Sequence, residues 1–318
     1  MMEHTAHHRW QMARPTPTSD YPNHLTDNAS PYLLPEWALF WERVWRNARA
    51  EVWQTQHAPS MVALCVRRRR ALWNWVHVLP YATPGSFGIT PAEIGSLIEA
   101  MTDTRTVQIS FGGMNATDTF SDWRSTILNF ESYVLDVSNS DESTPLALVT
   151  EHHQRNIDKG RAAHLDIRPV RSSEDVRQFQ ASWRGRGEER SRLVLDAKRG
   201  SIMAEVFAGS DGLAWSTAWQ ADTSVATCLW LVRRSQAVYV DGAVDRTAPA
   251  GVNHHLFATV LTSLYKRGVR YFDFGGGPLG QSSDGLVRFK EGWGAAPETR
   301  FETILRRPQY ASLRRIVR

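Results

Sequence analysis

One acidic residue, a run of glycines and an isolated lysine form the part of this chain best suited to chemistry. Residues 271–277 read Tyr-Phe-Asp-Phe-Gly-Gly-Gly, which predicts a buried strand that ends in glycines with wide backbone freedom. Lys290 follows, between an aromatic residue and a Gly-Trp-Gly turn, and the chain contains only four lysines among its 37 basic residues. An ammonium in such a place could stabilise the oxyanion of an acyl transfer. Asp273 could orient or deprotonate an attacking amine, or it could pair structurally with an arginine such as Arg288.

The neighbouring residues suggest how a substrate could be held. Gly275, Gly276 and Gly277 would allow a ligand to approach the backbone, although a plain turn after a strand explains them equally well. Phe289 could stack on an unpaired base or serve only in the core. Asp241 is a second acid on an adjacent predicted strand. The sequence contains no constellation typical of a metal site, no nucleophile elbow and no phosphate-binding P-loop, so we expect no metal.

A helix and a strand precede the glycines, and the same order occurs earlier in the chain. The apolar spacing of residues 253–264 predicts a helix, and residues 269–274 predict the strand. Residues 90–101 and 107–111 repeat this order, and they too end in Phe-Gly-Gly. Phe111 and Phe274 are 163 residues apart (274 − 111), about half the chain. We interpret the repeat as an internal duplication that produced two similar domains with mixed sheets, of which the second is equipped for chemistry.

Several segments spread along the chain resemble the Fem family, which transfers amino acids from aminoacyl-tRNA to an amine acceptor. The resemblance rests on Ser-Pro-Tyr at 30–32, Pro-Glu-Trp at 35–37, Phe-Glu-Ser-Tyr-Val-Leu-Asp at 130–136, His-His-Gln-Arg-Asn-Ile at 152–157, the strand and glycines at 271–276, and Gly-Leu-Val-Arg-Phe-Lys at 285–290. It implies an α/β (α+β) fold of two GNAT-like domains, each a mixed and largely antiparallel sheet flanked by helices. We therefore expect a flexible N-terminal leader over 1–29, GNAT-like domains over 30–160 and 161–304, and a basic tail over 305–318 that packs back on the first domain.

The resemblance also implies roles for the residues above. Lys290 and Asp273 would be catalytic, and Phe289, Arg288, Asp241 and the three glycines would bind substrate. Aminoacyl-tRNA would be the co-substrate, without a separate cofactor, and an amine of a peptide or small molecule would be the acceptor. The chain departs from the family at Trp41, which stands where the opening helix often carries a lysine that contacts a nucleotide-sugar precursor. We therefore expect Trp41 to line the substrate groove and an acceptor other than a cell-wall precursor.

Two alternatives stay open. An acyl-coenzyme-A-dependent N-acyltransferase of the same fold would need a glycine-rich pyrophosphate loop, but the matching residues 246–251 read Arg-Thr-Ala-Pro-Ala-Gly, with a proline where amide donors are wanted. A non-catalytic pair of RNA-binding domains is the other. Arginines cluster at 67–70, at 184–199 and at 306–318, and the pI is about 9.2, which suits contact with phosphates.

The bulk composition limits the setting. With 42% hydrophobic and 22% charged residues, the 318-residue chain is expected to be a soluble globular protein. No long apolar run predicts a membrane span, and the first residues do not resemble a secretory signal. Two cysteines cannot build a disulfide framework, so we expect a reducing, cytoplasmic location. The absence of a large apolar stripe favours a monomer.

Overall fold

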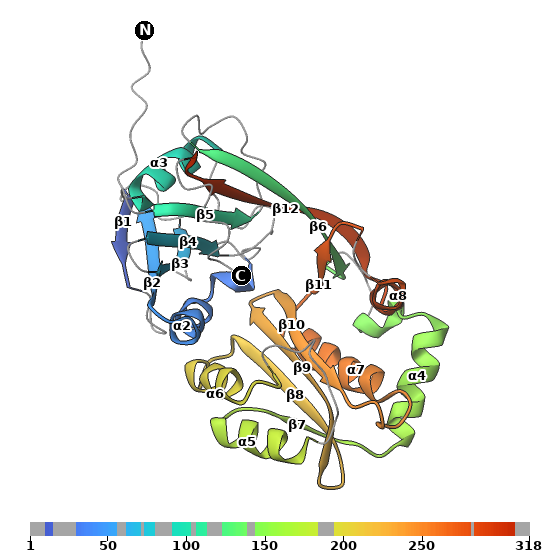
Figure 1. Ribbon diagram of the computed structural model, residues 1–318. Coiled ribbons are helices and arrows are strands. Elements are labelled where there is room, and N and C mark those ends of the chain that lie inside the picture. Colours follow the sequence, from blue (N-terminus) through green and yellow to red (C-terminus); the bar gives the residue numbers. More distant parts are fainter. Residues whose placement is uncertain are drawn as a thin grey trace. The chain divides into compact units, whose positions relative to one another are not determined.

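The structure is a computed structural model, and it describes residues 10–14, 30–55, 62–70, 73–79, 91–102, 106–112, 123–138, 144–183, 194–280 and 283–308 (Figure 1). The chain forms two compact units. Unit 1 comprises Met1–Phe130 and Thr299–Arg318, and unit 2 comprises Glu131–Glu298.

Unit 1 is built on a mixed sheet whose strands run in the order β1-β2-β3-β4-β5-β12. Neighbouring strands are antiparallel except β4 and β5, which are parallel. Helix α2 packs against β2 and β3. The elements are β1 (Trp10–Ala13), η1 (Pro31–Leu33), α2 (Pro35–Val44), β2 (Ala48–Thr55), β3 (Val62–Arg70), β4 (Trp73–Leu79), α3 (Pro91–Met101), β5 (Thr106–Gly112), and parts of β6 (Arg124–Asp136) and β12 (Ala296–Arg306), which continue into unit 2.

A proline marks the start of helix α2. Pro35 occupies the first turn, where a missing backbone N–H is no loss. The helix buries Trp37, Ala38 and Phe40, and the rings of Trp37 and Phe40 stack with centroids 5.5 Å apart. Trp41 is half-buried and contacts the edges of both rings.

Unit 2 repeats the arrangement of unit 1. Strands β7, β8, β9 and β10 are successively antiparallel, β10 and β11 are parallel, and β11 lies between β10 and β6. The elements are η2 (Pro145–Leu148), α4 (Glu151–Ala162), β7 (Asp166–Pro169), α5 (Ser173–Ser182), α6 (Ala197–Val206), β8 (Leu213–Gln220), β9 (Thr223–Arg233), β10 (Gln236–Val244), α7 (Val252–Lys266), β11 (Tyr271–Pro278) and α8 (Asp284–Glu291).

Helices cover both faces of the unit 2 sheet. Trp230 on β9 meets Phe257 of α7, with ring centroids 5.7 Å apart, whereas Trp215 on β8 meets Phe179 of α5 on the other face. Strand β9 is therefore buried on both faces, which explains its nearly unbroken apolar sequence. The mixed, largely antiparallel sheets with flanking helices agree with the predicted architecture, and a helix leads into the parallel strand in each unit, α3 into β5 and α7 into β11.

The bounds of the units differ from the division drawn from the sequence. Residues 10–13, placed there in a flexible leader, form β1 and pair with Val52–Thr55 of β2, because β2 would otherwise expose an unpaired edge. Residues 131–160 belong to unit 2 rather than to the first domain. Strand β12 extends to Arg306, so the segment predicted as a tail begins inside a strand, and residues 309–318 lie outside the described part.

Candidate active site

The residues proposed from the sequence lie in both units, but eight of the nine are in unit 2. Asp241 lies on β10, and Asp273 and the three glycines lie on β11. Arg288, Phe289 and Lys290 lie on α8. Trp41 is on α2 of unit 1. The geometry below therefore concerns unit 2.

The parallel strands β10 and β11 pair over a short length only. Their register runs from Gln236↔Tyr271 to Val238↔Asp273. Beyond it, β10 carries an irregularity against β9 between Tyr239 and Asp241, which leaves Val240 as the extra, bulged residue. A bulge where parallel strands stop pairing leaves backbone N–H groups available to a ligand. Sequence reasoning missed Val240, because no residue type marks a bulge of this kind.

A cavity of about 380 Å³ lies beside these strands. Phe289, predicted to bind substrate, and Lys290, predicted to be catalytic, both line it. Its other lining residues are Tyr239, Asn253, Phe257, Phe274, Ser283, Gly285 and Leu286. The cavity thus combines aromatic walls, the first turn of α7 and one cation. We call it the Lys290 cavity.

Lys290 is buried and held in place by the backbone. Its residue is 4% exposed, and its Nζ donates a hydrogen bond of 2.6 Å to the carbonyl oxygen of Gly275. The ammonium also lies over the ring of Tyr133, 5.1 Å from the centroid. Burial lowers the pKa of Lys290 below 10.5, while Asp273 and Glu131 oppose that shift. An ammonium has three donors, so the bond to Gly275 leaves capacity for a substrate oxygen.

Asp273 acts inside the protein rather than at an open surface. It is 1% exposed, and its Oδ1 accepts hydrogen bonds from Ser132 Oγ at 2.6 Å and from Gly275 N at 2.7 Å. These bonds fix the turn at Gly275, whose φ is 68°, and therefore the carbonyl that holds Lys290. The geometry favours Asp273 as a positioning residue for the ammonium over a base that takes a proton from substrate.

The remaining predicted residues have other surroundings. A Cβ on Gly276 would lie 1.5 Å from the carbonyl oxygen of Glu131, so close packing of β6 requires this glycine. Asp241 accepts a hydrogen bond from Val194 N at 3.0 Å, and neither it nor Arg288 lines the Lys290 cavity. Arg288 is exposed on α8. Gly277 is half-buried near the end of β11.

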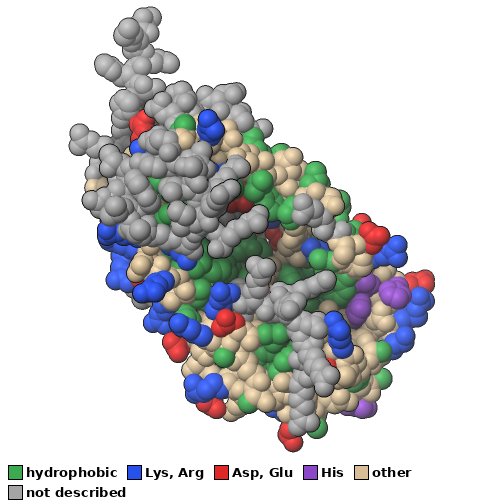
Figure 2. Space-filling view, viewed as in Figure 1, with side chains coloured by type: hydrophobic (Ala, Val, Ile, Leu, Met, Phe, Trp, Pro, Cys, Tyr) green, Lys and Arg blue, Asp and Glu red, His purple; other side chains and the backbone are tan. Residues whose placement is uncertain are grey.

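Helix α4 supports the carboxyl end of α8, a role that the sequence did not reveal. His153 is 4% exposed, and its Nε2 donates to the carbonyl oxygen of Phe289 at 2.9 Å. Burial lowers its pKa, so the neutral ring is favoured. The ring of His254 lies 4.5 Å away, and burial followed by the neighbouring histidine lowers the pKa of His254 to about 4. Figure 2 shows histidine side chains gathered on the surface near α4 and α8.

The loop before α7 is poorly suited to a pyrophosphate. Asp245 is buried, and its Oδ1 accepts from both the N–H and the hydroxyl of Thr247, each at 2.8 Å. The negative charge of this carboxylate would repel a bound anion. Gly251 packs so closely on α4 that a Cβ there would lie 2.1 Å from the carbonyl oxygen of Asn156. Together with Pro249, which has no N–H, these contacts argue against the arrangement expected for coenzyme A.

The comparisons with known proteins identify the fold. Residues 151–290 match the family model of the acetyltransferase (GNAT) domain, and this segment contains the Lys290 cavity. FemX is 12% identical, with a TM-score of 0.70 over 95% of this chain and 99% of that one. L-PGS from Bacillus licheniformis is 14% identical, with a TM-score of 0.56 over 96% of both chains. A tandem GNAT protein from the clavulanic acid biosynthesis pathway is 11% identical, with a TM-score of 0.54 over 93% of this chain and 98% of that one.

The fold is thus GNAT-like, and it is similar to the fold of FemX. The two GNAT-like domains predicted from the sequence are confirmed as a fold class. At these identities the solved structures establish the fold alone. No curated protein sequence matches the chain. Within the described residues, no helix is long and apolar enough to cross a membrane, and no group of three or more His, Cys, Asp or Glu side chains could hold a metal ion.

Proposed function

We propose that the protein transfers an aminoacyl group from aminoacyl-tRNA to an amine of a peptide or small-molecule acceptor. The observation that carries the proposal is the buried Lys290 ammonium, which lines an aromatic cavity where β10 and β11 stop pairing. The GNAT match and the Fem-like fold support acyl transfer as the class of reaction. Aminoacyl-tRNA is the co-substrate, and no separate cofactor is needed.

The reaction is a displacement at an ester carbonyl. The acceptor nitrogen attacks the carbonyl carbon, a C–N bond forms, and the C–O bond to the terminal ribose breaks. The proton lost by the amine is delivered to the departing ribose oxygen, so the products are an amide and an uncharged tRNA. Lys290 stabilises the negative charge that develops on the carbonyl oxygen. Phe289 and Phe257 form apolar walls that keep water from the ester.

The choice of tRNA over coenzyme A as donor rests on the loop before α7. Asp245 occupies the amide of Thr247, and α4 covers Gly251, so this loop offers little to a pyrophosphate. A terminal adenosine and its ester need the cavity but not this loop. Arg288 is exposed on α8 beside residues that line the cavity, and we expect it to contact a phosphate of the tRNA.

Single-turnover transfer with two labelled donors tests the proposal. The full chain is mixed with labelled aminoacyl-tRNAs, or separately with labelled acetyl-coenzyme A, and with pooled amines, in wild type, Lys290→Met and Lys266→Met. Lys266 is an exposed lysine at the end of α7 and serves as the matched control. We expect label to pass from tRNA to amine in wild type and Lys266→Met but not in Lys290→Met. Transfer from acetyl-coenzyme A alone would mean that the donor is acyl-coenzyme A and not aminoacyl-tRNA. Transfer by Lys290→Met at the wild-type rate would mean that Lys290 takes no part in the reaction.

A further inference from the structure

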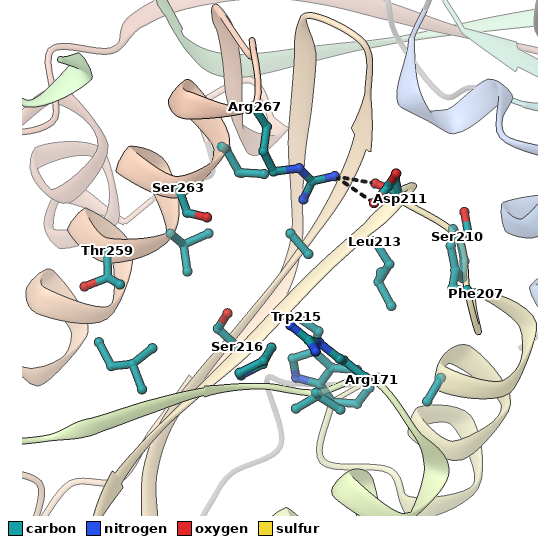
Figure 3. Close-up of a pocket in the computed structure, with 18 residues that line it drawn as sticks. Arg171, Phe207, Ser210, Asp211, Leu213, Trp215, Ser216, Thr259, Ser263 and Arg267 are labelled. Atoms are coloured by element: carbon teal, nitrogen blue, oxygen red, sulfur yellow. Dashed lines mark hydrogen bonds and ion pairs between the residues drawn. The ribbon is translucent and has the colours of Figure 1, made fainter. Parts of the chain in front are cut away.

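A second and larger cavity lies at the other end of α7. It has a volume of about 610 Å³ and is lined by the carboxyl-terminal half of α7, the start of β8 and the segment after α6 (Figure 3). The Lys290 cavity, by contrast, is lined by Asn253 and Phe257 at the amino-terminal half of the helix. The two cavities share no lining residue. We call the larger one the β8-edge cavity, and the proposed acyl transfer leaves it without a role.

The backbone of β8 is open toward this cavity. Strand β7 pairs with β8 from Asp166↔Trp219 to Pro169↔Ser216, and Val170 N then donates to Trp215 O at 2.8 Å. After that the chain turns away, because the N–H of Ser172 is bound by the carboxylate of Asp175 at the start of α5. β8 begins earlier, at Leu213, so the strand continues beyond its β7 partner.

The direction of the Leu213 amide follows from strand geometry. Successive residues of a strand direct their N–H and C=O groups to opposite edges, so Leu213 points to the same edge as Trp215. Gly212, one residue earlier, accepts a bond from Val232 N on the β9 side at 2.9 Å, as this alternation requires. Leu213 lines the β8-edge cavity. Its N–H and C=O are therefore one donor and one acceptor on the sheet edge that faces the cavity.

The walls add a charge preference. Arg171 and Arg267 line two sides of the cavity in the view of Figure 3. Arg267 donates to the carbonyl oxygen of Asp211 at 2.9 Å and pairs with its carboxylate at 3.7 Å, so the excess positive charge of the walls belongs to Arg171. Asp211 is the one acidic lining residue in the described part of the chain. The floor includes the buried residues Trp215 and Leu264. A ligand for these walls has backbone-like donors and acceptors, some apolar surface and a negative charge.

We propose that the β8-edge cavity binds an extended peptide that carries a carboxylate, and that the peptide adds a strand to β8 where β7 ends. The backbone of Leu213 gives and accepts one hydrogen bond each, as in other cases of strand addition. Arg171 pairs with the carboxylate, which an arginine can hold in a bidentate manner. Peptide side chains that face inward lie on the apolar floor. This function is a docking site, and it stands whether or not the proposed acyl transfer is correct.

Selection from a display library tests the docking site on the full chain. The library contains random peptides of about eight residues, roughly the length of a strand, with a free terminal carboxylate. We expect wild type to enrich peptides that contain acidic residues or depend on the terminal carboxylate. Fluorescence anisotropy of an enriched peptide then compares the variants Arg171→Ala, Leu213→Pro and Leu213→Ile. Proline removes the N–H on an edge where strands tolerate it, and isoleucine keeps the N–H.

The variants give opposite expectations for a docking site and for adventitious adhesion. Leu213→Pro should weaken binding about fivefold to tenfold, as one lost hydrogen bond predicts, while Leu213→Ile should not. Arg171→Ala should weaken it about tenfold or more, and Arg177→Ala, which removes an exposed arginine of α5 outside the cavity, should have no effect. Circular dichroism confirms that each variant folds. Peptides that bind all variants equally, no enrichment at all, or equal binding of acetate and glutamate without a peptide backbone would each overturn the proposal.

Discussion

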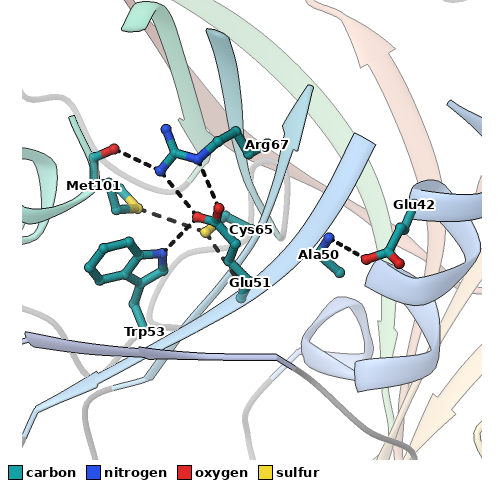
Figure 4. Close-up of polar contacts among 7 residues, drawn as sticks. All are labelled: Glu42, Ala50, Glu51, Trp53, Cys65, Arg67 and Met101. Carbon is teal, nitrogen blue, oxygen red and sulfur yellow. Dashed lines mark hydrogen bonds and ion pairs between the residues drawn. The ribbon is translucent and has the colours of Figure 1, made fainter. Parts of the chain in front are cut away.

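Each unit contains a buried network of charged groups. The two networks differ in the group that the basic side chain is hydrogen-bonded to. In unit 1, Arg67 donates to both carboxylate oxygens of Glu51, at 2.8 and 3.1 Å, and to the carbonyl oxygen of Met101 at 2.8 Å (Figure 4). Trp53 donates to the same carboxylate. In unit 2, the bond of Lys290 goes to a neutral carbonyl, that of Gly275.

The difference separates a structural network from one suited to chemistry. The Glu51–Arg67 pair neutralises both charges and ties β2, β3 and the end of α3 together. The Lys290 ammonium lies next to a cavity and binds a carbonyl, while Asp273 and Glu131 favour its charge and Asp273 also fixes the Gly275 turn. Burial of an incompletely paired cation costs stability, and proteins keep such groups chiefly at functional sites.

The largest effect is expected from Lys290→Met. If the ammonium stabilises an oxyanion, the single-turnover rate should fall about 10²- to 10³-fold. Stability should change by no more than about 1 kcal/mol, because the lower desolvation cost of methionine offsets the lost hydrogen bond to Gly275. Urea denaturation together with the transfer assay checks both expectations. Loss of activity accompanied by loss of stability would make Lys290 a structural residue and erase the contrast between the units.

The counterpart in unit 1 is Arg67→Met. This change leaves the buried Glu51 carboxylate without its partner and should destabilise the protein by about 3 kcal/mol. Transfer by the molecules that remain folded should be unchanged. The double variant Glu51→Gln with Arg67→Met should recover part of the loss, because neither charge then remains. Denaturation curves of Arg67→Met, Glu51→Gln and the double variant measure the coupling, and a coupling near zero would contradict a structural ion pair.

The stability of the two units should change with pH in opposite directions. The pKa of His254 is lowered from 6.5 to about 4, so its contribution to stability is present above 6.5 and is lost as the pH falls through about 4. The pKa of Glu302 on β12 is raised by burial from 4.5 to about 7, so its contribution is present below 4.5 and is lost as the pH rises through about 7. Each effect should amount to about 1–2 kcal/mol.

Hydrogen exchange followed by mass spectrometry can assign these effects to each unit. Peptides from α7 and α8 should lose protection as the solution is acidified, and peptides from β5 and β12 should lose it toward neutral pH. His254→Phe and Glu302→Gln should flatten the respective profiles. A profile that is unchanged in its own variant would show that another group titrates in that unit.

A smaller effect is expected from Ser132→Ala. The change removes the 2.6 Å hydrogen bond from Ser132 to Oδ1 of Asp273 and should cost about 1 kcal/mol of stability. Because Gly275 N still donates, the turn should persist and the transfer rate should fall only several-fold. Asp273→Asn should lower the transfer rate more than Ser132→Ala does, because it removes the negative charge of the carboxylate that faces Lys290. The reverse order would mean that Ser132 contacts the substrate directly.

The smallest effect is expected from Arg288→Ala. A single exposed phosphate contact should change the affinity for tRNA by about threefold at low salt and less at high salt. The slope of affinity against salt concentration should decrease by about one ion. An exposed arginine of unit 1, Arg46, provides the matched control. Equal effects of Arg46→Ala would mean that tRNA contacts unit 1 as well.

The local sequence predicted much of the scaffold of unit 2. The apolar spacing of residues 253–264 and the apolar run before the glycines predicted α7 and β11, because both signals arise from neighbouring residues in the chain. Lysine is rare in this chain, which singled out Lys290, and Lys290 is buried beside a cavity. Its hydrogen bond to Gly275, however, spans fifteen residues across a turn and leaves no local pattern.

Contacts between distant segments account for what the sequence could not reveal. Asp273 invited a catalytic role because a carboxylate in an apolar strand looks unpaired, yet Ser132, 141 residues earlier, is hydrogen-bonded to it. The segment predicted as a flexible leader contains strand β1, whose formation depends on the open edge of β2. The His153 bond to Phe289 and the bulge at Val240 likewise depend on register and packing.

The sequence by itself thus determined the elements, the repeat of helix and strand in both halves, and the residue types available for chemistry, because these depend on local spacing. The tertiary structure decided which polar groups satisfy one another. It paired Glu51 with Arg67 in unit 1 and placed Lys290 on a neutral carbonyl beside a cavity in unit 2. The physical reason is that the energy of a buried charge depends on the groups brought within a few ångströms of it, and folding brings those groups from remote parts of the chain.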